Sequence, residues 1–253
     1  MMLRRTGSIL LGAALFLALW QGLVLVTGLP PFLLPGPQAV ARALWTHQEV
    51  LARASLRTTT EILAGFALGS STGAVLAVAM AAFPRLAAGL RPVLLFSQVI
   101  PIFALAPILT LWLGYGMVPK IVVAALICFF PVASAFLDGL LRTAPACLDL
   151  SRVMQANGWR EMWHIRIPMA LPMLGTGLTL AAIYAPVGAV IGEWVGGSEG
   201  LGAVMLQANG RMRIDLTFAA LSLITLIALL FHTLVGAGVR RGFRRYGSTW
   251  NRA

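Results

Sequence analysis

Long apolar runs alternate with short polar stretches along the whole chain. A helix needs about 20 mostly apolar residues to cross roughly 30 Å of bilayer hydrocarbon. By this criterion the pattern predicts six membrane-spanning helices, at residues 7–27, 56–83, 91–113, 118–140, 169–194 and 216–239. The expected fold class is therefore all-α, a polytopic bundle of about six transmembrane helices that forms one domain over residues 1–253.

The N-terminal region allows alternatives at two places. The run at residues 7–27 is longer than the usual 7–15-residue core of a signal peptide, and Leu29-Pro30-Pro31 follows it, so we interpret it as the first span. Four prolines prevent a regular helix at residues 29–37. Residues 38–54 are then predicted as a helix near the surface, either interfacial and amphipathic or simply solvated.

The third apolar run is interrupted by Pro101 and Pro107. Such breaks are tolerated where the freed backbone is buried in protein or lines a cavity, although a plain proline kink is the alternative. Polar groups inside or at the mouth of spans are functional candidates by default. The candidates for a substrate path are Gln98, Pro101, Tyr184, Glu193, Asn209, Arg211 and Asp215.

Several charged residues near span ends have a candidate partner nearby in the sequence. Oppositely charged residues four apart lie on one face of a helix and can pair. For Glu193, near the end of the fifth span, an outer gate or a structural tie is the alternative to direct contact with a ligand. The expected pairs are Arg57 with Glu61, Asp138 with Arg142, and Glu193 with Arg211 or Arg213.

Composition supports a membrane protein, since 11% of residues are charged whereas a soluble domain carries about 25%. The mean hydropathy is +0.87. The net charge of +11 reflects basic residues at span ends, which set topology and meet anionic lipid, so no nucleic-acid partner is expected. With the N-terminus inside, thirteen of the 19 basic residues fall on the inner side and six outside, which predicts two cytoplasmic termini.

Little in the sequence suggests chemistry. Cys128 and Cys147 imply no disulfide framework, and the three histidines lack the spacing of metal ligands. The chain has no Gly-x-x-x-x-Gly-Lys-Ser/Thr loop for binding nucleotide phosphates. We therefore expect no catalytic residue, no metal and no cofactor, with any ATP hydrolysed by a separate subunit.

One polar stretch, residues 148–172, separates the fourth and fifth spans. Each charge at mid-bilayer costs roughly 2.5–3.5 kcal/mol, so this stretch must lie outside the hydrocarbon. Its pattern predicts two short helices that meet near Gln155–Gly158 and face the cytoplasm. They are either displayed for a partner or form a surface hairpin without one.

The spacing in this stretch resembles the coupling motif of permease subunits of ATP-binding-cassette (ABC) importers, which is Glu-Ala-Ala, three residues, Gly, nine residues, Ile, one residue, Leu-Pro. Gln155 occupies the position of that glycine, and we expect Gly158 to provide the bend instead. The resemblance implies a coupling segment over residues 146–168. Its ATPase-coupling residues would be Asp149, Leu150, Ser151, Gln155, Ala156, Gly158, Ile165 and Pro168.

Other motifs extend the resemblance over nearly the whole chain. Permeases for taurine, alkanesulfonates, nitrate and thiamine precursors have motifs that resemble three segments of this chain, residues 33–37, Ile100-Pro101 and Gly192-Glu193. The runs PIFALAPILTLWLGYGMVPKIV and APVGAVIGEWVG look most similar to permeases for a thiamine pyrimidine precursor, hydroxymethylpyrimidine or a formylated aminopyrimidine. Permeases for taurine, alkanesulfonate, nitrate or riboflavin are alternatives.

This resemblance implies a multi-pass protein of the inner (plasma) membrane that is not itself an enzyme. Its implied partners are two copies of an ATPase subunit, a second permease copy in a homodimer, a periplasmic or lipid-anchored binding protein, and membrane lipid. The rival class is an ion-coupled secondary transporter, which predicts inverted repeats and a buried acid at mid-membrane. A membrane-embedded enzyme and a scaffold subunit without a path are weaker alternatives.

Overall fold

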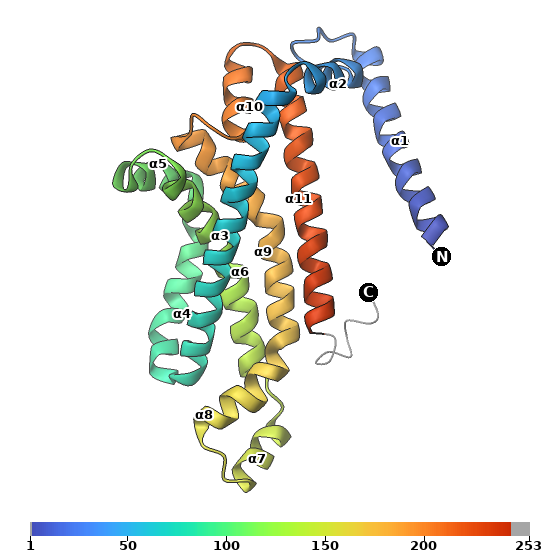
Figure 1. Ribbon diagram of the computed structural model, residues 1–253. Helices are drawn as coiled ribbons and strands as arrows, with labels where there is room; N and C mark the ends of the chain where they lie inside the picture. Colours follow the sequence, from blue (N-terminus) through green and yellow to red (C-terminus); the bar gives the residue numbers. More distant parts are fainter. Residues whose placement is uncertain (1, 244–253) are drawn as a thin grey trace.

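The computed structural model of the protein describes residues 2–243 (Figure 1). Helices make up its secondary structure, with no strand among the described residues, which confirms the all-α fold class. Three arginines of the tail that enter the topology prediction, Arg244, Arg245 and Arg252, lie outside the described residues. The helices are α1 (Met2–Thr27), α2 (Pro37–Thr46), α3 (Gln48–Ala82), α4 (Pro84–Val99), α5 (Ile102–Leu113), α6 (Met117–Leu141), α7 (Pro145–Val153), α8 (Gly158–Glu161), a π-helical turn (Met162–Arg166), α9 (Ile167–Gly196), α10 (Leu201–Gly210) and α11 (Ile214–Gly242).

Four helical stretches among the described residues are long and apolar enough to cross a membrane. They are α3, α6, the continuous helix over residues 158–196 that ends in α9, and α11. α4 and α5 qualify together as a fifth, bent span. The first expected span coincides with α1, of which Ala14–Thr27 is an apolar helix shorter than a full span, so that span stays a prediction.

The third expected span is divided into two helices by a sharp break, rather than bent by a plain proline kink. α4 ends at Val99, α5 begins at Ile102, and the two helices differ in direction by 99°. Pro101 stands between them in an extended conformation and cannot donate the hydrogen bond that would continue the first helix. α5 therefore leaves the bundle sideways (Figure 1).

The prediction of one surface helix over residues 38–54 is wrong, because this stretch is divided between α2 and the start of α3. His47, with φ −110° and ψ 22°, separates α2 from α3. The change of direction lets both helices bury apolar side chains, because Val40 of α2 and Leu51 of α3 join one cluster with Ala220 of α11. α2 thus lies across one end of the bundle (Figure 1).

Three long helices, α3, α6 and α9, form the centre of the molecule, with α6 packed against both neighbours. Glycines allow their backbones to approach closely, as small residues do between helices in lipid. A Cβ atom at Gly73 would lie 2.7 Å from the carbonyl oxygen of Phe129, and one at Gly188 would lie 2.6 Å from the Cα atom of Ala124. The helix contacts therefore leave no room for even a methyl group at these positions.

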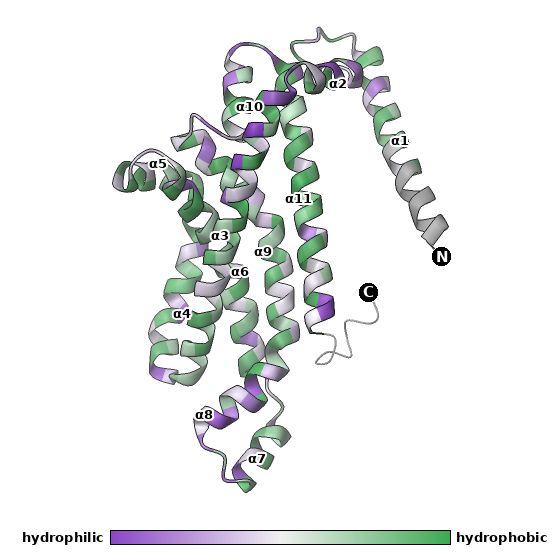
Figure 2. Ribbon diagram, viewed as in Figure 1, coloured by the Kyte–Doolittle hydropathy of each residue, from purple (hydrophilic) through white to green (hydrophobic). Residues whose placement is uncertain are grey.

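The polar residues gather toward the two ends of the long helices. Figure 2 shows hydrophobic residues along α6, α9 and α11, and hydrophilic residues concentrated around α2 and α10 at one end and around α7 and α8 at the other. This is the pattern expected of a bundle whose middle is surrounded by hydrocarbon.

Replacing Gly69 with alanine should destabilise the protein, because the new methyl group would collide with the backbone carbonyl oxygen of Ala125, which cannot swing aside. Overpacking of this kind costs about 1–3 kcal/mol, so the thermal unfolding midpoint of the purified protein should fall. Gly89→Ala in α4 is the matched control, since nothing lies within 4 Å of its new methyl group. Equal effects of the two substitutions would contradict this packing.

Candidate functional site

The segment between α6 and α9 projects from one end of the bundle as a pair of short helices (Figure 1). It exposes large apolar side chains, and Leu150, Val153 and Met154 are 59–80% exposed. The Trp159 and Trp163 rings, which are also exposed, meet edge to face at 5.7 Å. We call these five residues the coupling patch, because exposed apolar patches of this kind mark interaction sites.

A partly buried polar contact connects α7 to the helix that follows it. The Glu161 carboxylate accepts a hydrogen bond of 3.0 Å from the Ser151 hydroxyl and one of 2.8 Å from Nε of Arg166. Ser151 is 2% exposed, so this predicted coupling residue acts inside the segment rather than on its surface. The pair Asp149–Arg152, at 3.1 Å, is exposed and contributes little stability.

The turn after α7 has its left-handed residue at Gln155, which has φ +55°. The Gln155 N–H donates to the Arg152 carbonyl and the Ala156 N–H to the Ser151 carbonyl, a Schellman arrangement that ends α7. The expectation that Gly158 provides the bend is wrong. Gly158 begins α8, whose N-terminus is capped by the Asn157 side chain. Gln155 itself therefore adopts the left-handed conformation that the motif's glycine would provide.

The helix that carries Trp159 and Trp163 of the coupling patch continues without a break into the apolar bundle. The five-residue π-helical turn Met162–Arg166 joins α8 to α9, and it lies just before Pro168, which has no N–H to extend a regular ladder. Ile165 and Pro168 are half-buried at this junction. A displacement of the patch would therefore be transmitted along one rod, residues 158–196.

The break between α4 and α5 opens a second feature, a cavity of about 320 Å³. It brings together three of the predicted path residues, Gln98, Pro101 and Tyr184, beside Phe130 of α6. Ligand pockets begin at about 300 Å³, so the volume suits a small solute. We call this the break cavity.

The other four predicted path residues lie elsewhere. Glu193 is fully buried near the end of α9. Asn209 and Arg211 are exposed at the turn between α10 and α11, and Asp215 pairs with Arg213 at 3.6 Å. The structure thus divides the seven candidates between the break cavity and the opposite end of the bundle from the coupling patch.

Ion pairs at this opposite end join different helices. Glu61 meets Lys120 at 3.1 Å and Arg57 meets Glu199 at 2.9 Å, so the expected Arg57–Glu61 pair is wrong. Glu193 pairs with neither Arg211 nor Arg213. Its carboxylate accepts a 2.6 Å hydrogen bond from Thr58 and another from the N–H of Gly202, because Glu193 faces α3 and α10 inside the bundle.

Lys120 and Thr58 were missed by the sequence analysis. The sequence did contain one indication that Lys120 is unusual, because it is the only lysine in a chain with 18 arginines. The expected pair Asp138–Arg142 is also absent from the described structure. Arg142 is the residue that ends α6, and Asp138 lines a small cavity with Arg91 instead.

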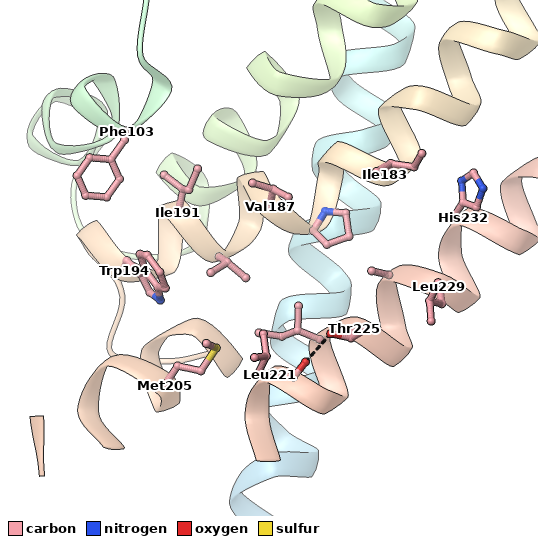
Figure 3. Close-up of a pocket in the computed structure, with 14 residues that line it drawn as sticks. Phe103, Ile183, Val187, Ile191, Trp194, Met205, Leu221, Thr225, Leu229 and His232 are labelled. Atoms are coloured by element: carbon pink, nitrogen blue, oxygen red, sulfur yellow. Dashed lines mark hydrogen bonds between the residues drawn. The ribbon is translucent and has the colours of Figure 1, made fainter. Parts of the chain in front are cut away.

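A further cavity of about 790 Å³ lies between α9 and α11. Figure 3 shows Ile183 and Val187 of α9 opposite Leu229 of α11, with His232 at one edge. The Thr225 hydroxyl donates to the Leu221 carbonyl at 2.9 Å and offers little to a ligand. This lining suits hydrocarbon rather than a polar solute, so we do not assign the path to it.

The apolar bundle and the exposed helical pair define a membrane-embedded transport subunit. Residues 69–245 match the family described as the binding-protein-dependent transport system inner membrane component. The chain belongs to this family, and it is therefore a permease subunit of an ABC transporter rather than an enzyme. Members of this family work with an ATPase subunit and a solute-binding protein.

Relatives agree with this assignment. A probable ABC transporter permease of Haemophilus influenzae is 44% identical, covering 88% of this chain and 91% of the relative. A riboflavin transport system permease of Chloroflexus aurantiacus is 35% identical, covering 88% and 84%. A formylaminopyrimidine transport permease of Halalkalibacterium halodurans is 33% identical, covering 79% and 80%.

A solved structure supports the fold alone. The inward-facing methionine ABC transporter contains a chain that superposes with a TM-score of 0.59 at 21% identity. The match covers 81% of this chain and 96% of that one.

Replacing Gln155 with valine should loosen the turn after α7, because a β-branched residue resists the left-handed conformation by about 1–2 kcal/mol. Amide hydrogen exchange of residues 150–158 should become faster. Gly158→Ala should leave exchange unchanged, because nothing lies within 4 Å of the new methyl group. If Gly158→Ala accelerated exchange and Gln155→Val did not, Gly158 rather than Gln155 would be the residue that provides the bend.

Proposed function

We propose that this chain is the permease of an ATP-driven importer for a small organic solute, a thiamine pyrimidine precursor of the hydroxymethylpyrimidine type. The observation that carries the importer proposal is the coupling patch, an exposed apolar surface on a helical pair tied to a membrane-spanning rod. Two ATPase copies would bind this patch on a pair of permease chains forming a homodimer. A binding protein would deliver the solute at the opposite end.

The proposed topology places both termini and the coupling patch in the cytoplasm. The excess of basic residues on that side supports it. The separation of the patch from α2 and α10, which lie at the other end of the bundle, is consistent with delivery of solute from outside (Figure 1).

The tie between α7 and the start of α9 suggests how force would pass. Closure of the ATPase dimer would displace α7 and α8 together, since Glu161 joins Ser151 to Arg166. The continuous helix would carry that displacement into the bundle as a rigid-body movement. The predicted contact residues Asp149 and Leu150 lie on the exposed side of α7.

The break cavity is the proposed path within each chain. Gln98 is exposed in an apolar helix, and an amide facing lipid would lack hydrogen-bond partners. That face is therefore better suited to a water-filled passage between two permease copies. The second group of predicted residues, Asn209, Arg211 and Asp215, would stand at its outer mouth.

The substrate proposal rests on relatives and on chemistry. The relatives named for riboflavin and formylaminopyrimidine transport both handle flat nitrogen heterocycles. The Gln98 amide offers one acceptor and two donors, and Tyr184 and Phe130 offer aromatic faces. A pyrimidine fits a cavity of about 320 Å³ more readily than the larger riboflavin, which remains the second candidate because of its 35% identical relative.

Replacing Leu150 with arginine should uncouple transport. A charge in the coupling patch would have to be desolvated against the ATPase, so we expect uptake by proteoliposomes containing permease and ATPase to fall at least about tenfold. Leu150→Met is the matched control and should retain uptake. Leu150 is 59% exposed, so both variants should insert normally. Uptake driven by an ion gradient without any ATPase would overturn the importer proposal.

Replacing Gln98 with leucine should reduce uptake of radiolabelled hydroxymethylpyrimidine, because a bound heterocycle would lose an orienting hydrogen bond worth about 1 kcal/mol or more. Tyr184→Phe keeps the ring and should have the smaller effect. Riboflavin is measured in parallel. If the complete importer takes up riboflavin and not the pyrimidine, the second candidate replaces the first.

A further inference from the structure

Two acids and one base are buried together at the end of the bundle opposite the coupling patch. Glu61 of α3 and Glu193 of α9 are 0% exposed and Lys120 of α6 is 3% exposed. Their neighbour Thr58 is also 0% exposed. We call these four residues the outer cluster. With every group ionised it would hold a net charge of −1 away from water, which is costly.

Among residues 2–243, no neighbouring charged residue removes that excess charge. Arg57 is already paired with Glu199 at the surface, at 2.9 Å. α5 and α10 contain no charged residue. Asp215 of α11 is paired with Arg213, and Glu49 of α3 with Arg53. The outer cluster must therefore balance its own charge.

The two carboxylates have different surroundings. Both oxygens of Glu193 accept hydrogen bonds, one from Thr58 and one from the Gly202 N–H, which favours the ionised form. No backbone N–H or hydroxyl donates to either oxygen of Glu61, whose cationic neighbour is the Lys120 ammonium, 3.1 Å from Oε1. The same ammonium donates a hydrogen bond of 2.8 Å to the Glu199 carbonyl, so Glu61 shares it with a second acceptor. Glu61 is thus the carboxyl group with fewer donors.

The described residues contain no group of three or more acids, histidines or cysteines that could hold a metal ion, and the glycine-rich segment packs tightly against the Glu193 carboxylate. A Cβ atom at Gly200 would collide with the Glu193 carboxylate, and one at Gly202 would lie 2.7 Å from Oε2 of the same group. A metal cation would also be repelled by the Lys120 ammonium. A proton needs neither space nor further ligands.

We propose that the outer cluster is a binding site for a single proton, which Glu61 carries while Glu193 and Lys120 stay charged. The cluster is then neutral, and the protonated Glu61 can donate a hydrogen bond to the neighbouring carboxylate. Thr58 donates to Glu193 and accepts from the Leu201 N–H at 2.9 Å, so the same network fixes the start of α10. The bound proton holds the glycine-rich segment 196–202 against α3, α6 and α9. This inference does not depend on the transported solute.

Amide substitutions identify the carboxyl that carries the proton. Glu61→Gln mimics the protonated acid, so the thermal midpoint of the permease in lipid nanodiscs should shift by less than about 2 °C. Lys120→Met removes the only cation of the outer cluster, so the buried negative charge of Glu193 is no longer balanced, and it should lower the midpoint by about 10 °C. Glu199→Gln, in the exposed pair, is the matched control and should behave like wild type. A Glu61→Gln protein as unstable as Lys120→Met would overturn the proposal.

Infrared spectroscopy tests the proton directly, without relying on stability. The wild-type protein at neutral pH should show the C=O stretch of a buried carboxylic acid, and Glu61→Gln should lack it. Persistence of that band in Glu61→Gln, or its absence from wild type, would overturn the assignment.

The pH dependence supplies an independent measurement. In the unfolded chain a glutamate loses its proton near pH 4.3, whereas the folded wild type would keep one, so wild-type stability should fall as pH rises above about 5. Glu61→Gln should lack this part of the slope. Identical slopes, or a wild-type midpoint that rises with sodium concentration, would overturn proton binding.

Discussion

Close contact between the backbones of α3, α6 and α9 is the constraint on which the rest of the structure depends. In hydrocarbon, helices gain little from the hydrophobic effect on association, so close packing must hold them together. Glycines at positions such as Gly73 and Gly188 permit it. The same tight contact removes water from the ends of α6 and α9, and it thereby determines that Glu61, Lys120 and Glu193 can interact only with one another and with their immediate neighbours.

α9 connects the two ends of the permease. Its N-terminal continuation carries Trp159 and Trp163 of the coupling patch, and Glu193 in its last turn belongs to the outer cluster. α6 is packed along it, and the break cavity lies between α4–α5 and these two helices. The continuous helix over residues 158–196 thus runs from the α8 end past the break cavity to the outer cluster.

Apolar run length predicted the long helices well, because hydrocarbon thickness sets a minimum length. The expected spans 118–140 and 216–239 lie inside α6 (Met117–Leu141) and α11 (Ile214–Gly242). The proline break after Gln98 was also predictable from the sequence. Its angle of 99° was not, because the missing N–H of proline interrupts a helix without determining the direction of the next one. Partners of charged residues were not predictable. Spacing within α3 suggested Arg57 for Glu61, whereas the burial of Glu61 against α6 selects Lys120.

Gln155 has a consequence for how permeases of this kind are recognised. The turn after α7 keeps the hydrogen bonds of a glycine turn while its residue is a glutamine with φ +55°. In this chain, the turn geometry is therefore formed without a glycine. A sequence search that requires glycine at this position would miss permeases in which another residue forms the same turn. A structural search for the two backbone hydrogen bonds, to the carbonyls at the positions of Ser151 and Arg152, would find them.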